Sequence, residues 1–307
     1  MKTTFWDVVA RPDYLPIVAL LPGMVVLFAW WLREALRNDA LEERGGLEAV
    51  ADDMRGDVPA PQRALGHDDV DRVHTWPYLL RIELLVSLAV LVVLTIWSIT
   101  VDAPLEQLAD PNRTPNPSKA PWYFLGLQEM LVYFDAWIAG VVLPILIILG
   151  LCAIPYLDPN PRGDGYYCWR PRRFALTTFW FGMFLWVALI VIGTFLRGPG
   201  WNWFWPWEVW DPNYFVDATS RNWADLFGID DARAASAVGG ITVLAYYALG
   251  GLAWWRYRES PSVRAMGPVR FGIVAFLWLT MLALPLKIVL RWALNIHYVW
   301  STPWFNI

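Results

Sequence analysis

Residues 174–196 read FALTTFWFGMFLWVALIVIGTFL, an apolar run that contains no charged side chain. A helix of roughly 20 residues crosses the hydrocarbon core of a bilayer, which is about 30 Å thick. Runs of similar length and character recur along the chain, at 14–32, 79–100, 136–154, 238–255 and 271–292. The sequence therefore predicts an all-α polytopic membrane protein with six transmembrane helices.

The composition agrees with this class and excludes several others. Of the 307 residues, 57% are hydrophobic and 17% are charged, whereas soluble proteins have roughly 45–50% and about 25%. The net charge of −4 and the lack of a Lys/Arg-rich run argue against a nucleic-acid partner. Cys152 and Cys168 form no CxxC or CxxCH motif, so nothing favours a disulfide framework, a cysteine zinc site or attached c-type haem. We expect no metal ligands in this chain.

The basic residues of the loops predict an orientation. Six, four and four Lys or Arg residues lie in 33–78, 155–173 and 256–270, while the alternate segments contain two, two and three. Loops rich in Lys and Arg face the cytoplasm. We therefore expect both termini on the outer side of the membrane. Lys287 and Arg291 depart from this bias at the outer end of the last span, where they either reach the interface or pair with another subunit.

The outer loop between the second and third spans contains the most informative sequence. Prolines at 111, 115, 117 and 121 make its first half stiff, and helix can begin only near 118–121. From Trp122 to Phe134 the segment is apolar but includes Gln128 and Glu129, and it is too short to span. We expect an interfacial helix that roofs a hydrophobic cavity.

Other chemistry has little support. Membrane proteins hold b-type haem between pairs of histidines, but His67, His74 and His297 all lie outside the predicted spans. We therefore expect no haem ligands here. Apolar span centres disfavour a transporter, which would show polar groups at mid-membrane. The Trp-rich stretch 201–210 is typical of an aromatic belt at the membrane surface, with a quinone or carbohydrate stacking surface as the alternative.

Three motifs resemble those of a known family. They are Pro121-Trp-Tyr123 after a proline-rich loop, Pro155-Tyr-Leu-Asp-Pro-Asn-Pro161, and Gly193-Thr-Phe-Leu-Arg-Gly-Pro-Gly200. Together they resemble the C-terminal half of cytochrome b, closest to the separate subunit IV of bacterial cytochrome bc and b6f-type complexes. The resemblance is strong over 75–212 and continues to Leu290-Arg-Trp-Ala-Leu-Asn-Ile296. It implies four parts: an additional transmembrane helix at 1–36, a cytoplasmic arm at 37–78, a subunit-IV-like core at 79–200, and an outer Trp-rich loop with two C-terminal helices at 201–307.

The resemblance also implies a quinol-oxidation site on the outer side, lined in this family by the tetrapeptide Pro-Glu-Trp-Tyr. Here the matching residues are Ala120-Pro121-Trp122-Tyr123, so Pro121 replaces the glutamate. The residues expected to contact quinol are Pro121, Trp122, Tyr123, Phe124, Leu127 and Met130.

The missing glutamate leaves three candidates for the catalytic proton step. Glu129 lies about 80° around the predicted helix and about 12 Å along it from Pro121. Asp135 lies at the mouth of the third span. The third candidate is a water chain that ends on Tyr123.

The resemblance implies a haem-free subunit of a quinol:cytochrome c oxidoreductase, with quinol as substrate. Its implied partners are a bis-histidine cytochrome b N-terminal subunit, a Rieske iron-sulfur protein with its 2Fe-2S cluster, a c-type cytochrome and lipids, in a complex that family analogy makes dimeric. Haem b and haem c would belong to those partners. The alternative is a structural membrane anchor of another quinone-linked respiratory complex, with a vestigial pocket.

Overall fold

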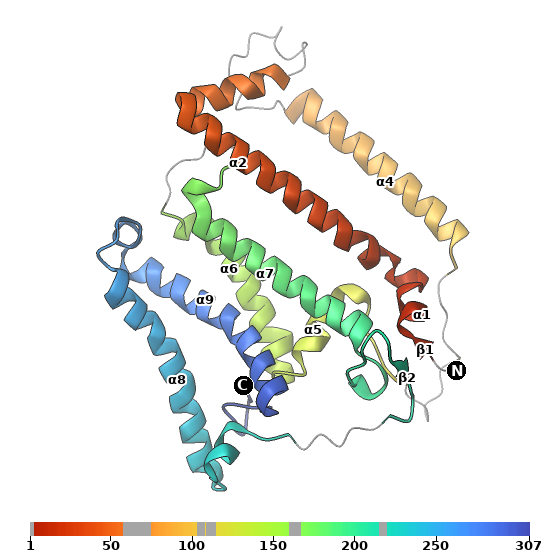
Figure 1. Cartoon of the computed structure of the whole chain (residues 1–307), viewed down its shortest axis with the longest axis vertical. Coiled ribbons are helices and arrows are strands. Elements are labelled where there is room, and N and C mark those ends of the chain that lie inside the picture. The colour runs from red at the N-terminus through yellow and green to blue at the C-terminus, as the bar shows by residue number, and fades with distance from the viewer. Residues whose placement is uncertain (1–2, 58–74, 103–107, 109–114, 160–166, 215–219) are drawn as a thin grey trace. The chain divides into compact units, whose positions relative to one another are not determined.

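The computed structural model describes residues 3–57, 75–102, 108, 115–159, 167–214 and 220–307, and nearly all regular structure in them is helical (Figure 1). Within these described residues, six helices are long and apolar enough to cross a membrane: Pro12–Gly45, Thr75–Thr100, Ile138–Leu157, Arg170–Leu196, Ala232–Tyr257 and Pro261–Leu294. Each coincides with a predicted apolar run. The prediction of an all-α polytopic fold with six spans is confirmed.

The described chain divides into two compact units, one of which comprises 10–109 and 162–173. Its main helices are α2 (Leu15–Asp57) and α4 (Leu80–Thr100). No residue of α4 is buried within the chain, and a helix that is apolar on all sides needs lipid or another protein around it. Short helical turns precede α2 at Pro12–Tyr14 and α4 at Thr75–Leu79.

Helix α2 runs past the predicted boundary at residue 36, because residues 33–44 are mostly strong helix formers such as Ala, Leu, Glu and Arg. The predicted arm is therefore helical to Asp57. It is anchored within this unit, since Asp39 accepts hydrogen bonds from the backbone N–H groups of Trp169 (3.2 Å) and Arg170 (3.1 Å). His67 and His74 lie outside the described residues.

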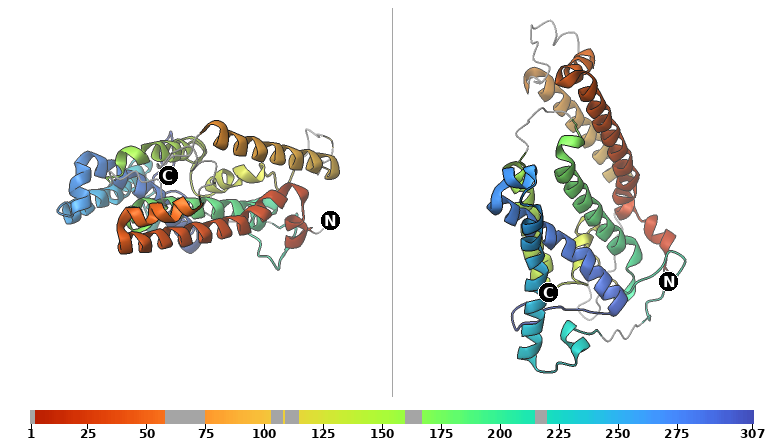
Figure 2. Two further views of the ribbon diagram at one scale, coloured as in Figure 1. Left: turned by 90° about the horizontal axis from the view of Figure 1, so that it is seen from above. Right: turned by 60° about the vertical axis from the view of Figure 1, so that its left-hand side comes forward.

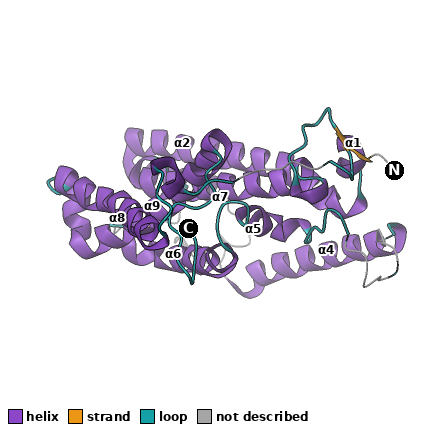
Figure 3. Ribbon diagram, turned by 90° about the horizontal axis from the view of Figure 1, so that it is seen from below, coloured by secondary structure: helices purple, strands orange, loops and turns teal. Residues whose placement is uncertain are grey.

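The other unit comprises 1–9, 110–161 and 174–307. Its helices are α1 (Phe5–Val9), α5 (Leu125–Met130), α6 (Leu143–Leu157), α7 (Arg173–Val191), α8 (Ala232–Tyr257) and α9 (Pro261–Leu294). A π-helical turn, Ile138–Val142, leads into α6, and another, Ile192–Leu196, extends α7. In the described chain the only strands are β1 (Thr3–Thr4) and β2 (Val209–Trp210), which pair antiparallel (Figure 3).

Helices α8 and α9 form an antiparallel hairpin with a short connection (Figure 2). Asp231 and Ser260 cap the two N-termini by accepting hydrogen bonds from Ala234 N and Val263 N. Gly267 breaks the helical geometry of α9 with a φ of 74°, and α9 ends where Asn295 takes a φ of 53°.

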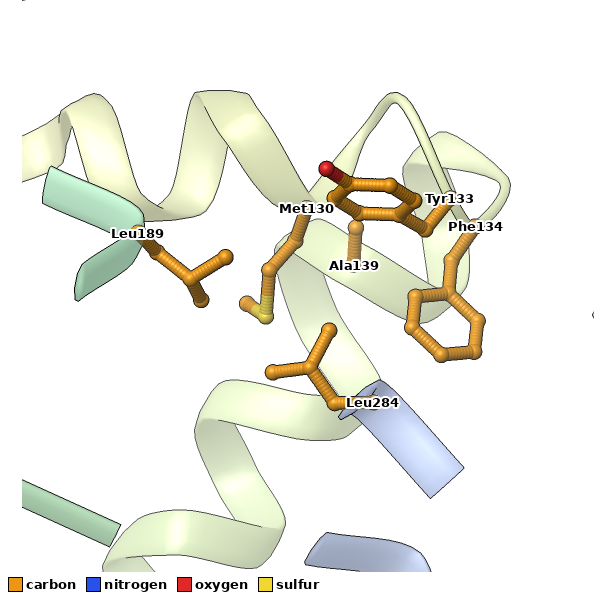
Figure 4. Packing of buried hydrophobic residues seen from close by; sticks show 6 residues of the cluster. All are labelled: Met130, Tyr133, Phe134, Ala139, Leu189 and Leu284. Carbon is orange, nitrogen blue, oxygen red and sulfur yellow. The ribbon is translucent and has the colours of Figure 1, made fainter. Parts of the chain in front are cut away.

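The core of this unit is small and lies where α5, the start of α6 and the end of α7 meet α9. Its buried members are Met130, Tyr133, Phe134, Ala139, Leu189 and Leu284 (Figure 4). Of the six candidate spans, α7 has 33% of its apolar window buried and each of the others at most 6%. Helix α7 is therefore the central support of the loops beside this core.

The interfacial segment differs from the continuous helix expected up to Phe134. A 3-10 turn covers Trp122–Phe124, α5 follows, and the chain leaves helix after Met130. The side chain of Gln128 explains the compact start, because it accepts a hydrogen bond from Ala120 N and donates one to Ser118 O, both at 2.9 Å.

Candidate functional site

A buried polar hub lies between α5 and the end of α7. Glu129 on α5 is fully buried, and each of its carboxylate oxygens accepts two hydrogen bonds. Oε1 accepts from Arg197 Nη2 (2.7 Å) and the Tyr133 hydroxyl (2.8 Å), and Oε2 accepts from Arg197 Nε (2.9 Å) and Trp201 Nε1 (3.2 Å). A carboxylate has about four acceptor positions, so this one is saturated.

The charges of the hub balance. Burial by itself lowers the pKa of Arg197, but the hydrogen bonds and charge of Glu129 outweigh it and the pKa ends above its ordinary value. Burial, followed by the charge of Glu129, raises the pKa of Tyr133. At neutral pH the hub therefore contains a charged guanidinium and a neutral phenol that both donate to Glu129. A bidentate Arg–carboxylate pair of this kind fixes orientation as well as adding energy.

The glycines of 193–200 let this hub form. A Cβ on Gly193 would lie 2.8 Å from the carbonyl oxygen of Leu125, so only glycine allows α5 to approach the end of α7 this closely. Gly200 has a φ of 65° and turns the chain so that Trp201 returns toward Glu129. The Arg197 guanidinium also lies 5.5 Å from the ring of Trp203 and donates to Trp201 O.

The proline-rich loop before α5 is fastened to the same place. Lys119 Nζ donates to Thr194 O at 2.7 Å and lies 4.7 Å above the ring of Trp210. Asn116 Oδ1 accepts a hydrogen bond from Gly200 N at 2.5 Å. Asn116 and Lys119 thus connect the loop before α5 to the residues that follow α7, and Glu129 connects α5 itself to the same residues.

The predicted quinol contacts separate into two groups. Pro121, Tyr123 (52% exposed) and Phe124 (51% exposed) lie at the surface with Trp122 half-buried beside them. Their rings form a row, with centroids 5.6 Å apart for Trp122 and Tyr123 and 4.8 Å for Tyr123 and Phe124. We call Trp122–Phe124 the aromatic row.

The second group lies deeper. Leu127 is half-buried and packs against the core cluster, and Met130 is a fully buried member of it (Figure 4). Both therefore lie in or against the core cluster, whereas Pro121, Tyr123 and Phe124 are exposed.

The three predicted proton-handling groups differ in their surroundings. Glu129 is enclosed by its four donors. Asp135 is half-buried; its Oδ1 accepts from Trp137 N (3.0 Å) at the start of the third span and its Oδ2 from Asn306 Nδ2 (3.2 Å), which leaves acceptor positions open. The Tyr123 hydroxyl has no hydrogen-bond partner among the described residues.

Sequence reasoning missed Arg197, Tyr133 and Trp201 as members of the site. Arg197 was used only as one of the basic residues that predict the orientation of the loops, although it lies inside the Gly193–Gly200 motif. Tyr133 follows Glu129 by four residues, the spacing at which side chains meet on one face of a helix. The long-range pairing between α5 and the residues that follow α7 had no local signal.

Two other features of the described chain have some of the properties of a binding site. Asp39, Glu42 and Cys168 place ligand atoms within 4.8 Å of one another, but both oxygens of Asp39 already accept backbone hydrogen bonds. An open apolar groove of about 510 Å³ lies between α6 and α9, lined by Leu146, Leu149, Ala153, Pro268, Val269, Gly272, Ile273, Phe276 and Leu277. It contains no polar group that could orient a ligand.

Comparison with known proteins places the hub inside a recognised segment. Residues 108–204 match the family model described as cytochrome b (C-terminal)/b6/petD. This chain is similar to the "Menaquinol:cytochrome c reductase cytochrome c subunit" of Geobacillus thermodenitrificans, with 35% identity over 92 residues that cover 28% of this chain and 37% of the relative. No solved structure matches. The resemblance to the C-terminal part of cytochrome b is therefore confirmed over residues 108–204, which include the aromatic row, Glu129 and Arg197.

Proposed function

We propose that the chain is a subunit of a quinol:cytochrome c oxidoreductase and that its loops 115–135 and 192–204 form part of the site where quinol is oxidised. One observation carries this proposal: the segment that matches the cytochrome b family contains an exposed aromatic row held in place by a saturated buried hub. A rigid wall of aromatic rings with one free hydroxyl is suited to a flat apolar ring that carries hydroxyl groups.

The residues have distinct roles in this proposal. Trp122 and Phe124 contact the quinol ring, and Tyr123 exchanges a hydrogen bond with a quinol hydroxyl. Pro121 supplies no proton acceptor where the family has a glutamate. Glu129 and Arg197 are positioning residues, because every acceptor position of Glu129 is already occupied.

Protons from quinol then need another route. Asp135 is the carboxylate of the loop that keeps open acceptor positions, and Tyr123 is exposed enough to pass a proton directly to water. We propose that these two groups, and not Glu129, lead protons from the site.

The rest of the machinery belongs to partners in this proposal. His297 is the one histidine among the described residues, and it lies beyond the last span. Haem b is then ligated by a separate bis-histidine cytochrome b subunit, while a Rieske protein and a c-type cytochrome accept electrons. The site faces the outer side of a bacterial cytoplasmic membrane.

The deciding experiment uses the assembled complex. Tyr123→Phe removes one hydroxyl and should lower quinol:cytochrome c turnover about tenfold, with the subunit content unchanged. Tyr156→Phe is the matched control, because Tyr156 is 76% exposed at the far end of α6. Asp135→Asn should change the pH profile of turnover, whereas Glu129→Gln should not.

An unchanged rate for Tyr123→Phe would contradict a quinol contact at this residue. If Trp122→Ala also left turnover unchanged in an assembled complex, the chain would be a structural anchor with a vestigial pocket.

A further inference from the structure

The segment that follows α9 returns to the loop of the proposed site. Residues 295–307 contain no regular helix or strand, and we call them the terminal segment. Asp135 N donates to Asn306 O at 3.3 Å, and Asn306 Nδ2 donates to Asp135 Oδ2 at 3.2 Å. The two residues therefore pair through both backbone and side chain, although 171 positions separate them in the sequence.

The terminal segment is fastened on both sides of Asn306. Trp300 N donates to Ile307 O (3.1 Å) and Ile307 N donates to Trp300 O (2.9 Å), which closes a turn that carries Asn306. The indole Nε1 of Trp300 donates to Ser236 Oγ on α8 at 3.2 Å. The side chain of Ile307 packs against the core cluster. Asn306 is therefore held in place by α8 and by the core.

The two carboxylate oxygens of Asp135 have different surroundings. Oδ1 accepts from Trp137 N at 3.0 Å, and the carbonyl oxygen of Asp135 accepts from Ala139 N at 2.8 Å, so these atoms satisfy donors at the start of the third span. Oδ2 accepts from Asn306 and from no other group among the described residues. A carboxylate oxygen has about two acceptor positions. Oδ2 thus keeps one position for a proton, and Asp135 is only half-buried.

An amide suits a carboxylate that gains and loses a proton. The Asn306 side chain has donors on Nδ2 and acceptor positions on Oδ1, so a rotated amide can accept from a protonated Asp135 as readily as it donates to the ionised form. In the described chain Oδ1 of Asn306 accepts no other hydrogen bond. Glu129 differs, because its partner Arg197 only donates and holds the carboxylate in the charged form.

The other titratable groups around this pair come from the same loop, from α9 and from the terminal segment: Tyr133, Lys287, Arg291, His297 and Tyr298. Burial, followed by the charge of Asp135, raises the pKa of Tyr298, so this phenol is neutral at pH 7. All five groups stay the same when Asn306 is replaced. A change in pH dependence between Asn306 variants therefore reports on the pair of Asp135 and Asn306.

We propose that Asn306 is a positioning residue for proton exit, and that its amide orients Oδ2 of Asp135 toward the proton that leaves quinol. This inference rests on the function proposed above, in which Asp135 accepts that proton and passes it to water. It gives a role to residues beyond the segment 108–204 that matches the cytochrome b family. Helices α8 and α9 hold the terminal segment, and the terminal segment holds the proton acceptor.

Turnover of the assembled complex against pH tests the inference. Asp135 must be ionised to accept a proton, so turnover falls on the acid side where it becomes protonated. Asn306→Asp places a second carboxylate opposite the first, and two adjacent carboxylates retain a proton at higher pH than one alone. The acid limb of turnover should therefore move up by about one pH unit or more. Asn213→Asp, at an exposed position between α7 and α8, is the matched control and should keep the parent profile.

A double-variant cycle separates a role through Asp135 from a general structural role. Asn306→Ala removes donor and acceptor together and should lower kcat about tenfold with KM unchanged, less than the roughly 10²–10⁴-fold of a lost general base because Asp135 remains. Asn306→Gln keeps the amide and should recover part of this rate. In a chain that already carries Asp135→Asn, Asn306→Ala should have no further effect, since residues that act together are not additive.

The backbone hydrogen bond from Asp135 N is available in all these variants. Asn306→Asp has nearly the shape of the parent side chain, so its pH profile decides the question if Asn306→Ala does not assemble.

Two results would overturn the inference: an acid limb of Asn306→Asp at the parent pH, or an equal loss of turnover on Asn306→Ala with and without Asp135→Asn. With either result, an altered pH profile of Asp135→Asn would leave the proposed proton route standing. An unchanged profile of Asp135→Asn would instead contradict the proton route itself, and the inference with it.

Discussion

Glu129 and Arg197, which are 68 residues apart in the sequence, form a bidentate ion pair with N–O distances of 2.7 and 2.9 Å in a place almost closed to solvent. The pair joins α5 to the turn that follows α7. The position of the aromatic row therefore depends on two separate segments of the chain.

Breaking this pair from the arginine side should be costly. Arg197→Met leaves a buried carboxylate without its cation and should lower the free energy of unfolding by about 3–5 kcal/mol, the usual loss when one partner of a buried pair is removed. Adding Glu129→Met should recover part of that loss. Denaturant unfolding in detergent measures both, with Arg233→Met as an exposed control. Additive losses in the double variant would argue against direct coupling.

Gly193 should tolerate no side chain. Gly193→Ala places a methyl group 2.8 Å from Leu125 O, which must push α5 away from α7 and should lower stability by about 1–3 kcal/mol. Quinol turnover should fall with it, because the aromatic row moves. Gly272→Ala on α9 is the matched control, since apart from its chain neighbours and the backbone of its own helix no group lies within 4 Å of the place its new methyl group would take. Equal stability and turnover of the two variants would refute the close-contact explanation.

Acid should destabilise the end of α9 through His297. Its pKa is about 4 in the folded protein and about 6.5 when unfolded, so the unfolded chain binds more protons between these values. Stability is complete above pH 6.5 and falls as the pH drops toward 4. His297→Gln should flatten this part of the curve when melting temperatures are compared at pH 7.5 and 4.5. An unchanged pH dependence would show that the ring is not held neutral.

The orientation can be tested with cysteine labelling in intact cells. In a chain with Cys152 and Cys168 replaced by Ser, a membrane-impermeant maleimide should label Ser220→Cys but not Glu259→Cys. Both positions are exposed in the structure, and the loop charges predict them on opposite sides. Labelling of Glu259→Cys alone would invert the topology and move the proposed quinol site to the cytoplasmic side.

The sequence alone determined the architecture of the membrane part. Uninterrupted apolar runs such as 174–196 predicted six spans because burying a helix in lipid requires only length and hydrophobicity, both of which are local properties. The motif from Pro121 to Tyr123 likewise pointed to the family segment that the comparisons confirm over 108–204. Helix α2 continues beyond residue 36 into the arm, and helix propensity, which favours this, is also a local property.

Only the tertiary structure decided what the polar residues do. Glu129 was expected to be a candidate general base because a carboxylate near the aromatic row has that chemistry; its capture by Arg197, Tyr133 and Trp201 depends on a contact across 68 residues. Met130 likewise lies in the core because α5 ends there and the chain turns. Whether a polar group is free or saturated is set by which distant groups fold against it, and no local pattern in the sequence records that.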